Sequence, residues 1–348
     1  MSAVERQLQA INPSIAEIMQ RHESHSRSPL NPLEVLASAA GTTQDYGALI
    51  GPLRSGLSGH FEELDSLQLD YKPVLAASYL VNLLTEDNLP EYKVRIDKIA
   101  EKSPELSAWL GRWTAEEYSH GTLLRDYGLL SGLIGGSDAV IDHDSYQSSR
   151  NSQLAKGTNV AIDSLAKGFA YTALQEDATF QAHNSEALLL DKIGGVSLRK
   201  IAGDEANHHQ AYSSMAKAML DHFPDETVIA IRDVFFDFSM PGEKGIPKFS
   251  ALAKTIAVSG LFDVATIKNL KAKLVGPKIW DIENRQFDSN EAKRAQQELL
   301  DGDPRDDRKI SILNSVRQKL IEKSQASGGL RPFILGVTVT KEELRAVA

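Results

Sequence analysis

The 348-residue sequence contains no cysteine, which excludes disulfides, cysteine-ligated zinc, iron–sulfur clusters and cysteine nucleophiles. Any metal must therefore be held by His, Asp or Glu. No uninterrupted apolar run approaches the roughly 18 residues of a membrane-spanning helix. The N-terminus lacks the basic start and apolar centre of a signal peptide. We expect no integral membrane association and a cytoplasmic protein; a mature plastid stroma protein fits the same observations.

Basic residues are also fewer than acidic ones. The chain has 38 basic and 47 acidic residues and a net charge of −9, which disfavours general attraction to nucleic acid or to anionic membranes. An acidic partner must instead meet a local basic cluster. Hydrophobic residues at 42% and charged residues at 24% are typical of a soluble globular protein with a large core.

The apolar residues recur at helical spacing from about residue 60 to residue 325, which predicts an all-α protein. Ser103 can cap a helix that begins at Pro104 and covers residues 106–130, and Asp225 is expected to cap another. Residues 4–21 are expected to form a short helix before a linker at 24–32, and residues 332–340 a strand or an extended arm. We divide the chain into an N-terminal helical and linker segment (1–59), a helical bundle domain (60–325) and a C-terminal extension (326–348).

Two predicted helices contain the motif Glu-x-x-His, at Glu117–His120 and at Glu205–His208. Residues three apart on a helix lie about 60° apart around its axis and about 4.5 Å along it, so the two side chains of each motif can bind one ion. As isolated matches these motifs are weak evidence, because glutamate and histidine also occur on solvated helix faces and in satisfied cores.

A single glutamate precedes each motif at nearly the same distance: Glu86 lies 31 residues before Glu117, and Glu176 lies 29 residues before Glu205. Both interrupt apolar helical patterns. Two helices with Glu-x-x-His and two with one Glu are the ligand pattern of di-iron carboxylate bundles. Four carboxylates and two imidazoles suit iron or manganese better than zinc or magnesium. The spacing therefore predicts a ferritin-like four-helix di-iron bundle core with additional helices.

The same segments carry a family resemblance. Residues 85–90 (TEDNLP), 112–121 (RWTAEEYSHG), 168–180 (GFAYTALQEDATF), 204–209 (DEANHH) and 238–241 (FSMP) resemble the soluble acyl-[acyl-carrier-protein] desaturases, over roughly residues 60–310 and in the order of that family. The resemblance implies an O2-dependent desaturase that introduces a double bond into an acyl chain carried on acyl carrier protein, with electrons from a ferredoxin, acting as a homodimer.

The resemblance also implies roles for individual residues. Two Fe ions per chain would be held with Glu86 and His120 on one, Glu176 and His208 on the other, and Glu117 and Glu205 bridging. Thr179 would lie beside the oxygen-binding face and help to deliver protons, although a threonine bonded to its own helix is an even alternative. Asp204 and Glu116 would orient the two imidazoles.

Other residues depart from the family pattern. Ser119 and Asn207 stand where the family commonly has a basic residue before each motif histidine, so a basic cluster for the carrier is sought at Arg199 and Lys200 together with Arg95 and Lys98. His183 and His209 are expected to be ordinary core histidines and not ligands, because each lacks a carboxylate at the right offset, although His183 matches a position of the family that the motifs resemble. The closest alternative activity is a di-iron hydroxylase or N-oxygenase acting on another carrier-bound or small substrate. Iron storage and radical generation fit the chain less well, and Leu124 stands where a radical-forming tyrosine would be needed.

Overall fold

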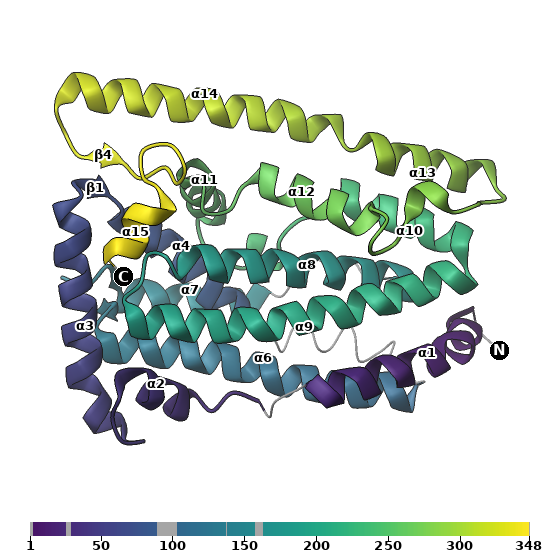
Figure 1. Ribbon diagram of the computed structural model, residues 1–348, viewed down its shortest axis with the longest axis horizontal. Helices are drawn as coiled ribbons and strands as arrows, with labels where there is room; N and C mark the ends of the chain where they lie inside the picture. Colours follow the sequence, from purple (N-terminus) through teal and green to yellow (C-terminus); the bar gives the residue numbers. More distant parts are fainter. Residues whose placement is uncertain (1–2, 26–28, 89–102, 137, 157–162, 348) are drawn as a thin grey trace.

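Helices dominate the computed structural model, which describes residues 3–25, 29–88, 103–136, 138–156 and 163–347 (Figure 1). The prediction of an all-α protein is confirmed. The described α-helices are α1 (Ala3–His25), α2 (Pro32–Ala40), α3 (Tyr46–Ser66), α4 (Lys72–Glu86), α6 (Pro104–Ser131), α7 (His143–Lys156), α8 (Leu165–Glu186), α9 (Lys192–His222), α10 (Pro224–Phe236), α11 (Phe249–Ser259), α12 (Val264–Val275), α13 (Asn290–Asp301), α14 (Pro304–Ser327) and α15 (Lys341–Val347). Short 3-10 turns, η1 (Pro241–Glu243) and η2 (Ile282–Asn284), lie in the connections.

The central layer consists of α4, α6, α8 and α9, as Figure 1 shows. On one side, α1 and α2 run along α6 and α9, and α3 crosses the end of the bundle. On the other side, α10, α11 and α12 lie between the bundle and the outermost helices α13 and α14. The core is therefore a four-helix bundle with additional helices, as predicted. The division at residues 59 and 325 stays a prediction; α3 and α14 run through these positions.

Helix α6 begins where the sequence predicts. Ser103 has extended backbone angles and its Oγ accepts a hydrogen bond from the backbone N–H of Leu106 at 3.1 Å. Pro104 occupies the first helical position, where a missing N–H costs nothing. The helix ends at Gly132, whose φ of 81° lies in the left-handed region that favours glycine. This helix carries one complete Glu-x-x-His motif.

Helix α10 begins differently from the prediction, and the expected cap at Asp225 is wrong. Phe223 occupies the cap position without a side-chain bond, and α10 starts at Pro224. The carboxylate of Asp225 instead accepts hydrogen bonds from the backbone N–H groups of Asp288 and Ser289, at 3.0 and 2.7 Å. A tertiary contact with the chain before α13 has thus replaced the local cap.

The C-terminal segment contains less strand than its β-branched composition suggests. Strand β4 comprises only Arg331–Pro332, paired in parallel with β1 (Leu69–Asp70), and a single bridge joins Leu335 to Val339. The second small sheet is formed by β2 (Ile134–Gly135) and β3 (Ile141–Asp142). The tail then ends in α15, which packs against α3.

Two hydrophobic clusters occupy opposite ends of the bundle. Along α6, Trp109 and Trp113 belong to one cluster, and Leu124 and Tyr127 to the other. The Glu-x-x-His motif of α6 lies between them. The same division occurs in α9, where the motif stands between Leu198–Ile201 and the apolar residues from Ala211 onward. The predicted ligands therefore form a polar layer between two apolar regions.

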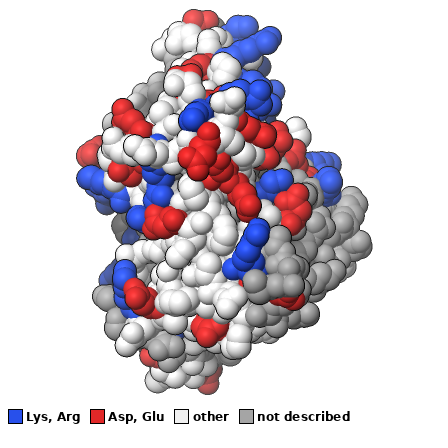
Figure 2. Space-filling view, turned by 90° about the vertical axis from the view of Figure 1, so that its right-hand side faces the viewer, with Lys and Arg blue, Asp and Glu red and all other residues white. Residues whose placement is uncertain are grey.

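No single helix among the described residues is long and apolar enough to cross a membrane. Helices α11 and α12 reach that length and apolar character only when taken together, and they meet at a bend of 80°. On the face shown in Figure 2, acidic and basic side chains are interspersed around an uncharged area.

Candidate metal centre

The predicted ligands come from the four bundle helices and are all buried. Glu86 ends α4, Glu176 lies in α8, and the two Glu-x-x-His motifs lie in α6 and α9. Glu117 is the most exposed of the six, at 7%. Buried carboxylates and imidazoles are costly unless they are paired or bind a metal, so their concentration in one layer needs a function.

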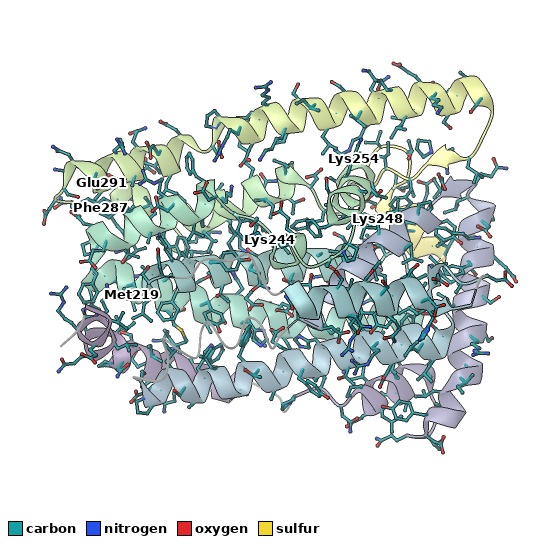
Figure 3. The ribbon with its side chains drawn as sticks, turned by 180° about the vertical axis from the view of Figure 1, so that it is seen from behind. Met219, Lys244, Lys248, Lys254, Phe287 and Glu291 are labelled. Atoms are coloured by element: carbon teal, nitrogen blue, oxygen red, sulfur yellow. The ribbon has the colours of Figure 1, made fainter. Side chains whose placement is uncertain are left out.

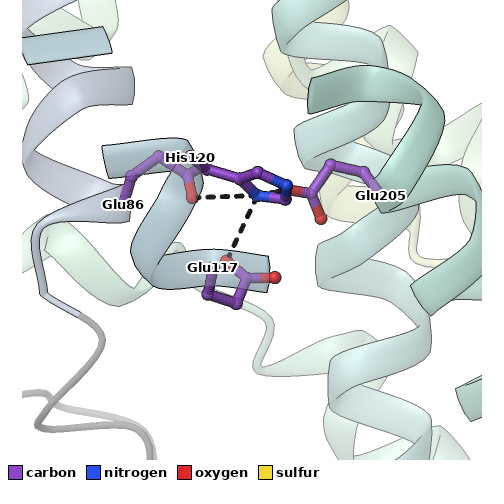
Figure 4. Close-up of side chains that lie close together, drawn as sticks. All are labelled: Glu86, Glu117, His120 and Glu205. Carbon is purple, nitrogen blue, oxygen red and sulfur yellow. Dashed lines mark ion pairs between the residues drawn. The ribbon is translucent and has the colours of Figure 1, made fainter. Parts of the chain in front are cut away.

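These side chains form two overlapping groups. The first contains Glu86, Glu117, His120 and Glu205, and Figure 4 shows these four converging. The second contains Glu117, Glu176, Glu205 and His208. In each group one possible ligand atom from every residue lies within 4.8 Å of the others. Because Glu117 and Glu205 belong to both groups, the site offers two adjacent metal positions with two shared carboxylates.

The atoms at the centre are close together but form few hydrogen bonds with one another; Nδ1 of His208 and Oε2 of Glu205, 3.4 Å apart, form one. Nδ1 of His120 lies 3.0 Å from Oε1 of Glu205, and Nδ1 of His208 lies 3.0 Å from Oε1 of Glu117. Even so, five of the six side chains have a buried atom that lacks a hydrogen-bond partner: Glu86 Oε2, Glu117 Oε1, His120 Nδ1, Glu176 Oε2 and Glu205 Oε1. Lone pairs that converge but do not pair with one another are what a bound cation requires. The buried cluster fits a metal and can hold one.

The outer nitrogen of each imidazole meets a carboxylate. Nε2 of His120 lies 3.2 Å from Oδ2 of Asp204, and Nε2 of His208 lies 2.7 Å from Oε2 of Glu116. Arg112 donates to the other oxygen of Glu116 at 3.2 Å. An Nε2–H that donates to a carboxylate leaves the Nδ1 lone pair free to face the centre. The contacts predicted for Asp204 and Glu116 are present.

Comparison with known proteins identifies the group to which this site belongs. The family model described as fatty acid desaturase matches residues 8–327. The chain belongs to the fatty acid desaturase family.

Among the relatives, DesA1 of Mycobacterium tuberculosis, named as an acyl-[acyl-carrier-protein] desaturase, is 28% identical over 299 residues, covering 84% of this chain and 82% of its own. The chloroplastic stearoyl-[acyl-carrier-protein] 9-desaturase 1 of Arabidopsis thaliana is 30% identical over 286 residues, covering 76% of this chain and 68% of its own. The resemblance seen in the sequence motifs is therefore confirmed.

The fold agrees with that of a solved member. The X-ray structure of DesA2 from M. tuberculosis, described as an acyl-ACP desaturase, superposes with a TM-score of 0.56. It covers 84% of this chain and 99% of its own at 18% sequence identity. At that identity the likeness concerns the fold alone, and it supports the ferritin-like helical bundle.

In this desaturase-family chain the charges at the cluster are strongly coupled. Burial, followed by the charge of Glu176, raises the pKa of Glu117 to about 8. Burial and then Glu205 raise the pKa of Glu176 well above its usual range. Burial alone would lower the pKa values of His120 and His208, but the surrounding carboxylates outweigh it and raise both. Without a metal the cluster must retain protons, and a cation takes over their role.

Two further contacts to the cluster were not predicted. His183, expected to be an ordinary core residue, is buried with Nε2 3.0 Å from Oε1 of Glu86. Burial tends to raise the pKa of Glu86, but His183 and then His120 outweigh it, so this pKa lies below its usual range. Trp113 donates from Nε1 to Oε1 of Glu176 at 3.1 Å. The sequence held one usable signal: His183 lies seven residues after Glu176, on the same face of α8.

Oγ1 of Thr179 donates to the carbonyl of Gln175 at 2.9 Å, the helix bond that was the alternative to a role with oxygen. His209 bonds to the carbonyl of Ala173 at 2.8 Å, away from the cluster. Arg199 and Lys200 line a surface crevice with Asp204 on α9. Arg95 and Lys98 lie outside the described residues.

A mainly apolar cavity of about 260 Å3 lies beyond the ligand-bearing turns of α4 and α8. Ala182 and Glu186, in its wall, follow Thr179 by one and two turns of α8. The residues of α10, α11 and the adjoining connections supply most of the apolar surface: Phe236, Phe238, Met240, Phe249, Ile256, Leu261 and Phe262. Such a surface suits a hydrocarbon chain.

Proposed function

We propose that this protein is an acyl-[acyl-carrier-protein] desaturase with two iron ions per chain. The observation that carries the proposal is the pair of overlapping ligand groups with their converging, unpaired atoms. The printed names of its relatives supply the substrate class. Removal of two hydrogen atoms from adjacent methylenes, with O2, two electrons and two protons, gives one double bond and two molecules of water.

In this proposal Glu86 and His120 hold one iron, Glu176 and His208 hold the other, and Glu117 and Glu205 hold both. When bound, the iron pair supplies the reduction of dioxygen that drives the oxidation. Asp204 and Glu116 keep each imidazole in the tautomer that presents Nδ1 to the metal. The ion-pair partners of Glu205 and Glu117 are the imidazoles of His120 and His208, which would bind the metal in the loaded protein, so the iron ions would balance the carboxylate charge.

Thr179 is proposed to move protons at the oxygen-binding side of α8. Its hydroxyl accepts a hydrogen bond from Nε2 of Gln175 at 3.1 Å and donates one to the backbone carbonyl of Gln175. Both contacts lie within α8. Rotation of χ1 would release that proton from the helix backbone. This role uses only the side chain of Thr179 and does not change how the metal is held.

The acyl chain is proposed to occupy the cavity beside α4 and α8, with its carrier protein docked outside. The carrier is acidic, so a cluster of cations must attract it in a chain of net charge −9. Lys244, Lys248 and Lys254 are exposed in and before α11, next to the cavity wall, as labelled in Figure 3. None of the three forms an ion pair with another described residue.

We further propose a ferredoxin-type electron donor, a homodimer and a cytoplasmic location. The donor follows from the need for two electrons per turnover, which the substrate does not supply. Light scattering at micromolar concentration tests the dimer, and a monomer would refute it. These assignments rest on the family.

The decisive test is mass spectrometry of a panel of acyl-carrier substrates incubated with iron-loaded protein, reductant and oxygen. A desaturase yields a product lighter by two hydrogen atoms. A hydroxylase or N-oxygenase yields a product heavier by one oxygen atom, and this result would replace the proposal. The matched control is the Glu117→Ala variant under the same conditions, which separates reaction at the cluster from oxidation by free iron.

A further inference from the structure

The cavity beside α4 and α8 has two different walls. Aromatic and aliphatic side chains cover most of it, and charged residues of α12 and α14 occupy one edge, where Lys309 is 59% exposed. The opposite wall is formed by α4 and α8, deep in the bundle, and contributes three polar residues: Ser78, Asn82 and Glu186.

Glu186 is unusual in this setting because it is a carboxyl group facing an apolar cavity. It is the last residue of α8 and is 1% exposed. Its Oε2 accepts a hydrogen bond from Nδ2 of Asn82, on α4, at 2.6 Å. Its Oε1 is buried and has no hydrogen-bond partner among the described residues.

The two oxygens of Glu186 therefore have different roles. Asn82 fixes the carboxyl group through Oε2, while Oε1 accepts no hydrogen bond from a described residue. Nearby Ser78 donates to the carbonyl of Leu75 at 3.3 Å, and its hydroxyl also lies close enough to the Glu186 carboxylate to lower the pKa of that group. Burial raises the pKa of Glu186 to about 7, against the opposing effects of His183, Asn82 and Ser78. A buried acceptor without a partner destabilises the folded protein unless a ligand supplies the donor.

We propose that Glu186 recognises a hydroxyl group on the acyl chain, whose O–H donates to Oε1. The inference rests on the proposed function, because it assumes that an acyl chain enters this cavity. It narrows the substrate class from plain saturated chains to chains that carry a hydroxyl group within the apolar part of the cavity. Glu186 is then a specificity-determining residue, and it takes no part in the oxidation itself.

The positions of the charged residues in the cavity wall indicate that the hydroxyl group belongs to the acyl chain and not to the carrier's prosthetic arm. Lys271, Asp303, Asp306 and Lys309 line the α12–α14 edge, where a polar arm can be solvated. Asp303 and Asp306 already have cationic partners, Arg305 and Lys271. Glu186 lies on the opposite wall, among the helices that carry the metal cluster, where only the acyl chain has reason to enter.

The test compares carrier protein loaded with a saturated acyl chain and with the same chain bearing one hydroxyl group, at a series of positions. Binding is measured by calorimetry with metal-free protein, and kcat/KM with iron-loaded protein. Glu186→Leu removes the acceptor, and Glu186→Gln keeps the shape while offering an amide. Asp191→Asn is the control, because Asp191 is a buried carboxylate at the start of α9 and outside the cavity.

At one hydroxyl position the parent protein should prefer the hydroxylated chain by about tenfold or more in both binding and kcat/KM. Glu186→Leu should bring this ratio close to one, whereas Asp191→Asn should keep it. No preference in the parent, or a preference that survives in Glu186→Leu, would overturn the inference. Equal loss of affinity for both substrates in Glu186→Leu would also overturn the inference, because the group that donates to Glu186 would then lie on the carrier's prosthetic arm, which both substrates share.

Failure of the inference and failure of the proposed function give different results. If the plain chain is desaturated and no hydroxylated chain is preferred, the function stands and the role of Glu186 is wrong. If neither chain is oxidised by iron-loaded protein, the proposed function fails, and the calorimetric ratio still reports on Glu186. Melting temperatures of both Glu186 variants show whether the fold is retained.

Discussion

Glu116 and His208 face each other across the bundle, with Oε2 of Glu116 2.7 Å from Nε2 of His208. They lie on α6 and α9, and each is next to or part of a Glu-x-x-His motif. Burial tends to raise the pKa of Glu116, but His208 and then Arg112 outweigh it and keep this pKa below its usual range. An ionised Glu116 can only accept, so it keeps a hydrogen on Nε2 of His208 and leaves Nδ1 as the nitrogen that can bind a metal.

Replacing Glu116 should therefore weaken metal binding without removing a ligand. We expect Glu116→Gln to lower iron affinity by about 10- to 100-fold, because the amide can donate to Nε2 and favour the wrong tautomer. Competition with a chelator measures the change. Glu105→Gln, in the first turn of the same helix, is the control. Equal affinity in parent and Glu116→Gln would show that the contact does not orient the ring.

Glu117 belongs to both ligand groups, so its loss should affect both metal positions. Reconstituted parent protein is expected to hold about two irons per chain, and Glu117→Ala should lose most of that iron. Glu62→Ala, at an exposed position of α3, should retain it. Metal analysis after gel filtration gives the count. Full iron content in Glu117→Ala, or less than one iron in the parent, would rule out the assignment.

Metal-free protein should lose stability as the pH rises. The pKa of Glu117 is about 8 in the folded protein and about 4.3 in an unfolded chain. Such a group holds its proton more tightly in the folded protein than in the unfolded chain. Its contribution to stability is complete below the pKa of the unfolded chain and is lost as the pH rises through the pKa of the folded protein. The raised pKa values of His120 and His208 act in the same direction.

The measurement is the melting temperature between about pH 5 and about pH 9, in chelator and after iron loading. We expect a decline with pH in chelator and a flatter curve with iron, because a bound cation replaces the protons. A metal-free curve that stays level or rises across this range would contradict the electrostatic description of the cluster.

Thr179 offers a prediction that separates chemistry from metal binding. Thr179→Ala should reduce kcat by about tenfold or more if the hydroxyl moves protons, with iron content unchanged. Thr179→Ser keeps a hydroxyl and should retain most of the rate. If alanine and serine variants turn over equally, Thr179 only bonds to its own helix, as its contact with Gln175 allows.

The sequence predicted the parts of this site that follow from local rules. Helical periodicity, the cap at Ser103 and the repeated spacing of Glu86 and Glu176 before their motifs need only neighbouring residues to be recognised. Contacts between helices could be predicted from the sequence only where a motif implied them, as for Asp204 and His120. His183 against Glu86 and the Asn82–Glu186 pair join residues 97 and 104 positions apart without such a motif. The position of His183 on the ligand face of α8 was a signal in the sequence, but its partner Glu86 and the Asn82–Glu186 pair are revealed only by packing. Asp225 shows the converse, because a tertiary contact displaced a local cap.

Two basic pairs are the candidates for the proposed docking of the carrier protein. Lys248 and Lys254 each follow or precede a residue of the cavity wall, Phe249 or Ala253. Arg199 and Lys200, the pair favoured by sequence spacing, line the crevice at Asp204. If the acyl chain enters the cavity, Lys248→Glu with Lys254→Glu should raise KM for the carrier-bound substrate several-fold and leave kcat and iron content nearly unchanged. Rising salt should likewise raise KM in the parent protein, because screening acts mainly on the encounter of the two proteins.

Arg199→Glu with Lys200→Glu is the matched comparison, since it alters the net charge by the same amount. A larger KM effect in that variant would move the docking surface to α9, and a salt-independent KM in the parent would exclude electrostatic docking at either pair.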